Sequence, residues 1–288
     1  MVGSQWRKYE ESLFQSGLNE VPEGTDSDFH ISVVSIEENS IGSDTKSPYV
    51  VPPGIPRDID NTTIVQRRTN EQSLQICVDD LSDGDAKAVF KESNFDLINY
   101  GRIKMFIHAE PNNGDIISDN EIHAFLRFGS DYENNYYEIE LPLKITRPSL
   151  INQNSSNIER LIWPEENEIN VYLEELLSLK SERNRKNIDV TLPYSKISNN
   201  GKYVFKIVGR PTLSSVLNFM IGVKNPLSDD KSSKSACLWF NELRLTDFDR
   251  TKGWAANASL NLKLSDFGMV SSSARSVSYT HLTLPTKA

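Results

Sequence analysis

Short segments in which apolar and polar residues alternate recur along most of the chain, and Gly, Asp and Asn turn signals separate them. A period of two is typical of β-strands, whose side chains point alternately to opposite faces. Strands are predicted at residues 29–36, 74–78, 102–110, 121–128, 136–143, 202–208, 217–223 and 236–246. The pattern indicates a mainly β protein, a jelly-roll-like β-sandwich with one inserted helix.

Two segments show the spacing of an α-helix instead. Residues 5–15 place their apolar positions three to four apart and are predicted to form a short N-terminal helix. Residues 173–183 are predicted to form the inserted helix. Its narrow stripe toward the sheet is expected to consist of Leu173, Leu176, Leu177 and Lys180.

Residues 256–265 alternate more strictly than any earlier segment. One set of positions is wholly apolar, from Ala256 to Leu264, and the other is wholly polar, from Asn257 to Ser265. This matches a transmembrane β-strand of about 9–11 residues with lipid on one side and water on the other. A half-exposed strand of the soluble sandwich fits the pattern equally well. In the membrane interpretation, residues 266–268 form a turn and 269–276 begin the return strand.

The resulting division of the chain has four parts. Residues 1–28 are an N-terminal helix and linker, and 29–253 are the β-sandwich with a helical insertion near 173–184. Residues 254–276 are candidate outer-membrane barrel strands. Residues 277–288 are interpreted as a cloning or assembly scar, because a transposon-end adapter sequence encodes ten of them.

The net charge of −9 argues against a nucleic-acid partner, since a phosphate backbone requires clustered Lys and Arg that this sequence lacks. The N-terminus shows no basic segment followed by an apolar stretch, so no signal peptide is expected. No run of about 20 apolar residues predicts a transmembrane helix. Taken alone, these features favour a cytoplasmic protein, an inference that fails if the chain is an internal fragment.

The two cysteines, Cys77 and Cys237, lie far apart and match no metal-ligand spacing. They could form one disulfide in an oxidising compartment. Both lie in apolar, strand-like runs, where cysteine behaves as a small hydrophobic residue. Two buried thiols are therefore the preferred interpretation.

Candidate metal and catalytic residues form no convincing site. The acidic cluster Asp79, Asp80, Asp83 and Asp85 fails the EF-hand spacing, so a polar turn is preferred over a calcium loop. His108 and His123 lie in neighbouring strand-like runs and could face each other, but no third ligand for zinc accompanies them. No nucleophile, base and orienting group occur together, so no catalytic, cofactor-binding or metal-ligating residue is assigned, and no enzymatic activity is expected.

Aromatic residues offer an alternative function. If they lie on the surface of the sandwich, they could stack on sugar rings, as in a carbohydrate-binding module of a cell-surface protein. The other interpretation is that they pack in the core and at sheet edges. The residues concerned are Tyr132, Tyr136, Tyr137, Trp163 and Trp239.

Several short sequence motifs, in order from residue 6 to about 270, resemble motifs of the SprA/Sov family. No single motif is specific for the family, but the order and spread of the motifs along the chain make the resemblance specific. They are WRKY at 6–9, YVVPPGI at 49–55, QRR at 66–68, NEQSL at 70–74, DGDA at 83–86, KMFIHAE at 104–110, GSDY at 129–132, NYYE at 135–138, WPE at 163–165, IGVKNP at 221–226, NELRLTDF at 241–248 and GWAA at 253–256.

The resemblance implies a function that the composition does not. SprA/Sov proteins are outer-membrane translocons of the type IX secretion system, and gliding bacteria need them to export surface proteins. This chain would be an internal structural fragment, located at the outer membrane and facing the periplasm or the cell surface. Its implied partners are the rest of its own translocon chain, outer-membrane accessory proteins and secreted cargo. Membrane contact is expected only through 256–276.

Overall fold

The structure is a computed structural model, and it describes residues 6–9, 13, 28–57, 59–60, 67–152, 155–249, 254–264 and 268–278. The chain divides into two compact units, Met1–Asp247 and Phe248–Ala288. Each unit is described by itself below.

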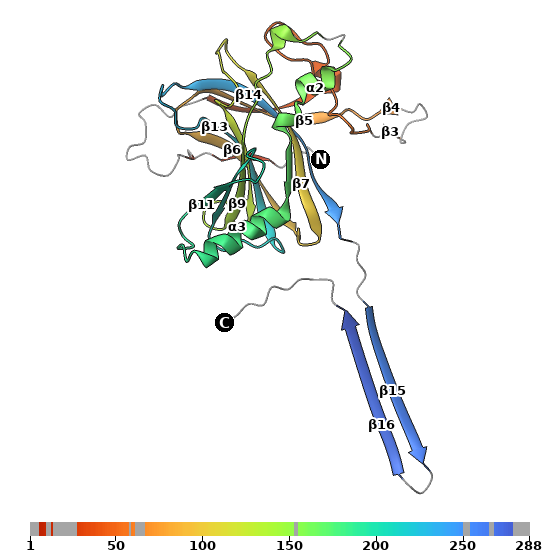
Figure 1. The fold of residues 1–288 in the computed structure, drawn as a ribbon. Coiled ribbons are helices and arrows are strands. Elements are labelled where there is room, and N and C mark those ends of the chain that lie inside the picture. The colour runs from red at the N-terminus through yellow and green to blue at the C-terminus, as the bar shows by residue number, and fades with distance from the viewer. Residues whose placement is uncertain are drawn as a thin grey trace. The chain divides into compact units, whose positions relative to one another are not determined.

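The larger unit is mainly β and contains two antiparallel sheets (Figure 1). The seven-stranded sheet has the order β1 (Arg7–Lys8), β6 (Ala86–Phe95), β13 (Val216–Lys224), β8 (His123–Gly129), β9 (Tyr136–Pro142), β12 (Val204–Val208) and β11 (Tyr194–Ile197). The five-stranded sheet has the order β10 (Ile169–Tyr172), β7 (Tyr100–Pro111), β14 (Lys234–Phe248), β5 (Gln72–Leu81) and β2 (Asp28–Ser35).

Shorter elements complete this unit. The paired strands β3 and β4 are Ile59–Asp60 and Arg67–Arg68. The α-helices are α1 (Ile36–Asn39), α2 (Ile158–Ile162) and α3 (Leu173–Arg185), and short 3-10 helices lie at Pro148–Leu150 and Glu165–Asn167. Within the described part of the chain, no helix has the length and apolar character needed to cross a membrane.

One hydrophobic core contains side chains from both sheets. Ile76 and Ile107 enter it from the five-stranded sheet, and Leu126 and Ile139 enter it from the seven-stranded sheet. The consecutive strands β5, β6, β7 and β8 alternate between the two sheets, so the chain crosses this core repeatedly. The apolar positions of the period-two pattern therefore form the two sheet faces that meet in the core.

Each of the eight expected strand segments coincides with an observed strand, with its ends moved by a few residues. Strand β6, Ala86–Phe95, escaped the sequence analysis although it is ten residues long. Its inward positions include Lys91 and Ser93, which both border the space between the sheets. Polar residues at inward positions break the alternation by which the other strands were recognised.

The predicted N-terminal helix is wrong where the structure describes it. Arg7–Lys8 is a strand paired with β6. Beyond this strand, the backbone N–H groups of Tyr9 and Leu13 donate hydrogen bonds to carbonyl oxygens of β6. The edge of β6 satisfies backbone groups that an isolated short helix would leave exposed at its ends. The other residues of 5–15, apart from Trp6, lie outside the described residues.

The inserted helix is confirmed as α3, but its buried stripe differs from the expected one. Its buried residues are Leu173, Leu176, Leu179 and Arg183. Leu177 is 39% exposed, and Lys180 is partly exposed with its ammonium donating to the carbonyl of Pro211. The stripe thus continues to the end of the helix through an arginine that apolar patterning does not detect.

The smaller unit contains a β-hairpin. β15 (Trp254–Leu264) pairs with β16 (Gly268–Ser278) from Trp254 opposite Ser278 to Leu264 opposite Gly268. The strand expected at 256–265 and its return strand are therefore both present, and residues 265–267 lie outside the described residues. β16 includes the first two residues of 277–288, whose interpretation as a scar stays a prediction.

Candidate functional site: the disulfide and the buried polar cluster beside it

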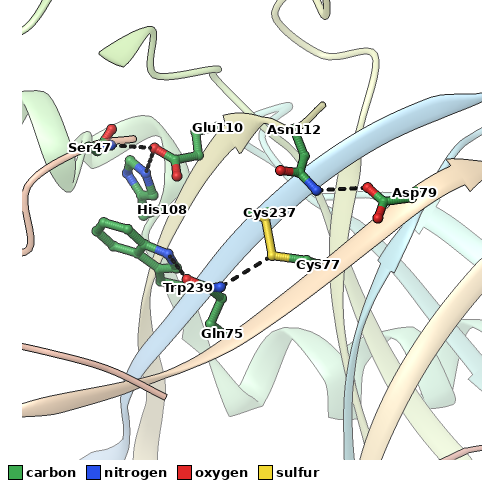
Figure 2. Close-up of a disulfide and its surroundings, with 9 residues drawn as sticks. All are labelled: Ser47, Gln75, Cys77, Asp79, His108, Glu110, Asn112, Cys237 and Trp239. Carbon is green, nitrogen blue, oxygen red and sulfur yellow. Dashed lines mark hydrogen bonds and ion pairs between the residues drawn. A yellow bond between two sulfur atoms is a disulfide. The ribbon is translucent and has the colours of Figure 1, made fainter. Parts of the chain in front are cut away.

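Cys77 of β5 and Cys237 of β14 form a disulfide with an S–S distance of 2.01 Å (Figure 2). The two residues are directly opposite in the antiparallel register, and their Cα atoms are 4.1 Å apart. Because Ile76 and Val78 point into the shared core, Cys77 lies on the opposite, outer face of the sheet. The preferred interpretation of two thiols is wrong, although both residues are buried as expected, at 8% and 6% exposure.

Trp239 lies two residues beyond Cys237, on the same face of β14. Its indole N–H donates to the side-chain oxygen of Gln75 over 2.9 Å, and the amide nitrogen of Gln75 lies 3.3 Å from Cys77 Sγ (Figure 2). The ring of Trp239 also stacks on His108, with 4.0 Å between ring centroids. A buried layer of rings therefore lies beside the disulfide on the outer face of the five-stranded sheet.

His108 connects this layer to two covering segments. Its Nδ1 lies 2.8 Å from the carbonyl oxygen of Ile162, and its Nε2 lies 3.3 Å from Oε2 of Glu110. The same Glu110 oxygen accepts the backbone N–H of Ser47 over 2.9 Å. One histidine and one glutamate thus attach the segments that contain Ser47 and Ile162 to strand β7.

The electrostatics favour a charged carboxylate at Glu110. Burial alone would raise its pKa, but the hydrogen bond and charge of His108 and the N–H of Ser47 outweigh burial and lower the pKa. A neutral imidazole donates from one ring nitrogen only. Both His108 nitrogens face acceptors, the carbonyl oxygen of Ile162 and the carboxylate of Glu110.

A second set of buried polar groups surrounds Tyr49. Its hydroxyl donates to Oε2 of Glu71 over 2.9 Å, and Oγ of Ser73 lies 2.8 Å away. Asn241 Nδ2 donates to the same hydroxyl over 3.0 Å. Burial raises the pKa of Tyr49 well above its ordinary value, so the phenol stays neutral.

Trp163 completes the arrangement. It is 1% exposed, packs edge-on against Tyr49, and donates its indole N–H to the carbonyl of Val50 over 2.8 Å. A hydrophobic cluster unites these rings on the outer face of the five-stranded sheet, and it consists of Val34, Tyr49, Phe106, Ile162, Trp163 and Trp239. The polar atoms of its rings hydrogen-bond to neighbouring residues, namely Val50, Gln75 and Glu71, so the cluster attaches the covering segments to the sheet.

The acidic cluster extends from the end of β5 into the β5–β6 connection. Asp79 accepts the side-chain amide of Asn112 over 2.7 Å, and Asp83 accepts from the backbone N–H and hydroxyl of Ser228. Asp85 accepts the N–H of the next residue over 2.7 Å, and Asp80 adopts a positive φ of 55°. Among the described residues, no three His, Cys, Asp or Glu side chains are grouped as metal ligands.

His108 and His123 lie in different sheets, so the suggestion that they face each other is wrong. His108 belongs to β7 of the five-stranded sheet, and His123 begins β8 of the seven-stranded sheet. Each pairs with its own carboxylate, and His123 Nδ1 lies 2.6 Å from Oε1 of Glu140.

The sugar-stacking alternative is not favoured, because most of the aromatic residues proposed for it are buried. Tyr137, Trp163 and Trp239 are 0%, 1% and 2% exposed, and Tyr136 is 7% exposed. Tyr132 is partly exposed, and its ring packs against Tyr9 with 5.5 Å between centroids. Rings that are buried in the core or under covering segments cannot stack on a saccharide.

Two ion clusters on the outer face of the seven-stranded sheet escaped the sequence analysis. Glu138 lies between Arg127 and Lys206, with N–O distances of 2.7 Å and 2.5 Å. Glu140 follows two positions later on β9 and lies between His123 and Lys224, with N–O distances of 2.6 Å and 2.9 Å. The signal available was the repeated glutamate in the alternating segment 136–143, which places both carboxylates on one face.

The positive partners control the ionisation of Glu138. Burial alone would raise its pKa, but the charges and hydrogen bonds of Arg127 and Lys206 lower the pKa to about 2. Glu140 shows the same direction, since burial is outweighed by His123 and Lys224. Both carboxylates are therefore fully charged at neutral pH.

Comparison with known proteins identifies the family of the chain. None of the curated proteins compared with the chain matches it. Residues 1–285 match the SprA_N family, which is described as motility related/secretion protein, and the resemblance found in the sequence is confirmed. The chain therefore belongs to the SprA_N family of motility-related and secretion proteins.

Proposed function

We propose that this chain is a non-catalytic structural segment of an outer-membrane protein-secretion translocon, needed for export of surface proteins and for gliding motility. Membership of the motility and secretion family over residues 1–285 is the observation that carries the proposal. The larger unit then serves as a rigid scaffold, a jelly-roll-like β-sandwich formed by its two antiparallel sheets. Its partners are the rest of the translocon chain, outer-membrane accessory proteins and the secreted cargo.

The disulfide supports a location outside the cytoplasm. Disulfides form and persist in the periplasm and on the cell surface, whereas the cytosol keeps thiols reduced. Cys77 and Cys237 are bonded and lie on the outer face of the five-stranded sheet, at 8% and 6% exposure. The segment accordingly faces the periplasm or the cell exterior.

The hairpin of the smaller unit contributes strands to the membrane barrel of this translocon. β15 and β16 have 11 residues each, which suits barrel strands of about 9–11 residues. The register places the apolar positions 260 and 262 opposite Ser272 and Val270, and the polar positions 261 and 263 opposite Ser271 and Met269. The apolar positions of β15 are assigned to lipid and the polar positions to an aqueous lumen.

Deletion in the complete protein tests the functional proposal. Removal of residues 28–247 in frame, in the source bacterium, is expected to abolish surface-protein export and gliding. The matched control is Lys46→Met, a substitution at an exposed loop position, which is expected to leave both unchanged. Normal export and motility in a deletion strain that still produces the shortened protein would contradict the proposal.

Trapping thiols in living cells tests the location. Acid quenching followed by alkylation is expected to leave Cys77 and Cys237 unmodified until a reductant is added. Full alkylation without reductant would show a reducing compartment and would contradict the location outside the cytoplasm.

A further inference from the structure

A cavity of about 370 Å³ lies between the two sheets of the larger unit. Both sheets contribute to its apolar walls, which include Leu74, Ile103, Met105, Phe219, Ile221 and Phe240. Ligand pockets typically measure about 300–1,000 Å³, so this cavity has the size of a small-molecule site at the lower end of the range.

Two polar side chains of β6 also line this apolar cavity. Lys91 is opposite Phe219 in the register, and Phe219 belongs to the core between the sheets. Residues that are directly opposite on paired strands share a face, so the Lys91 side chain leaves the sheet toward the cavity. Ser93 lies two residues along the same face, and its Oγ is buried with no hydrogen-bond partner among the described residues.

The missing partners of these two polar groups among the described residues leave them available to a ligand. A buried hydroxyl without a partner has lost its hydrogen bonds to water, and most inward-facing polar atoms in proteins are paired. No carboxylate of the described residues lies within salt-bridge distance of Lys91, although the lysines of the outer face, Lys206 and Lys224, both have one. Lys91 and Ser93 therefore present a positive charge and an unused hydroxyl to the same apolar space.

The other charged residues at the cavity balance each other. Glu242 and Arg244 also border it, and their charged atoms are 3.9 Å apart. With one negative and one positive charge cancelled, the charge of Lys91 remains. Among the described residues, the cavity thus combines apolar walls with one uncompensated positive charge at its border.

We propose that this cavity binds a single-chain amphiphile with an anionic head. The carboxylate or phosphate of the head pairs with the Lys91 ammonium and accepts the Ser93 hydroxyl, while the alkyl chain lies between the sheets against Met105 and Ile221. Trp6 and Phe95 also line the cavity, and Phe95 is 52% exposed, which places part of the site at the surface where a ligand can enter.

Binding of three ligands that differ only in their heads tests the proposal on the full chain. Decanoate, decyl phosphate and decanol are titrated by calorimetry and by tryptophan fluorescence, because Trp6 lines the cavity. At least one of the two anions is expected to bind about tenfold more tightly than decanol, since a charge-assisted contact contributes more than about 1.4 kcal/mol. The tighter anion identifies the head as carboxylate or phosphate.

Variants locate the site. Lys91→Met keeps the length of the side chain and is expected to reduce the affinity of the anion about tenfold without changing that of decanol. Lys46→Met removes an exposed lysine outside the cavity and is expected to have no effect. Trp6→Phe is expected to remove the fluorescence change while calorimetry still detects binding.

Three results would overturn the proposal. They are no binding of either anion to the unmodified chain, equal affinity for decanol and the anions, and equal affinity of the Lys91→Met and unmodified chains for the anion. The comparison of heads uses the unmodified chain and so stays decisive even if Lys91→Met fails to fold.

Discussion

Cys77 and Cys237 lie directly opposite each other on adjacent antiparallel strands, although 160 residues separate them in the chain. Closing a loop of this length restricts the unfolded chain strongly, and the chain-entropy relation gives a stabilisation of about 5 kcal/mol as an upper value. The bond therefore belongs among the larger single contributions to the stability of this unit.

Removing the disulfide is expected to lower the free energy of unfolding by about 2–5 kcal/mol. The comparison is between the unmodified chain and a Cys77→Ala, Cys237→Ala variant in urea titrations. Adding reductant should destabilise the unmodified chain and leave the variant unchanged. Equal midpoints for the oxidised chain and the variant would show that the bond contributes nothing.

Glu138→Gln is expected to destabilise the larger unit by about 3 kcal/mol, because it leaves the partly buried charges of Arg127 and Lys206 without a carboxylate. The matched control is Glu166→Gln, whose side chain is 61% exposed and pairs with Lys144. That change should cost no more than about 1 kcal/mol. Equal losses for the two variants in urea titrations would contradict a special role for the buried ion cluster.

The lowered pKa of Glu138 also predicts a dependence of stability on pH. A carboxyl with a depressed pKa in the folded state contributes its stabilisation above the unfolded value of 4.5 and loses it as the pH falls toward about 2. Glu140 and Glu110 shift in the same direction. The free energy of unfolding should therefore decrease across this acidic window, and Glu138→Gln should reduce the slope. An unchanged slope would show that other groups dominate.

His108→Phe should loosen the covering segments without unfolding the sheets. The substitution keeps an aromatic ring beside Trp239 but removes the contacts to Ile162 and Glu110. Hydrogen exchange is expected to accelerate in residues 47–50 and 158–163 and to stay slow in β5 and β8. His30→Phe, at an exposed position of β2, is the control. Unchanged protection of both segments would contradict their attachment by His108.

In the complete protein, Leu262→Arg is expected to hinder membrane assembly, because a charge on the lipid face of a barrel costs about 2–4 kcal/mol at mid-bilayer. Asn261→Arg, at the adjacent position of β15, should be mild because it faces the proposed aqueous lumen. The measurement is the amount of protein in the outer-membrane fraction. Equal amounts for both variants, or a larger loss with Asn261→Arg, would contradict the assigned faces.

Local patterning was sufficient for most strands and for α3. Strand β9 illustrates why, since its alternating apolar positions, such as Ile139 and Leu141, are the ones buried in the core. Strand β6 was missed because Lys91 and Ser93 occupy inward positions, and the N-terminal segment was assigned to a helix because its pairing with β6 depends on a distant edge. Local sequence does not report long-range pairing.

The buried polar cluster was not predictable for the same reason. Its central contacts join residues far apart, such as Tyr49 with Asn241 and Trp163 with Val50. The disulfide follows from the register between β5 and β14, which neither cysteine's neighbourhood specifies. The aromatic residues were recognised as candidates, but only the packed structure shows that four of the five are buried, in the core or under covering segments.

The order of strands has a consequence for biosynthesis. β13 is flanked by β6 and β8, and β14 is flanked by β7 and β5, so each sheet receives an interior strand from the segment 216–248. A nascent chain that ends before this segment exposes unpaired edges in both sheets, and such edges promote aggregation. Completion of both sheets must therefore wait for the last strands of the unit to be synthesised.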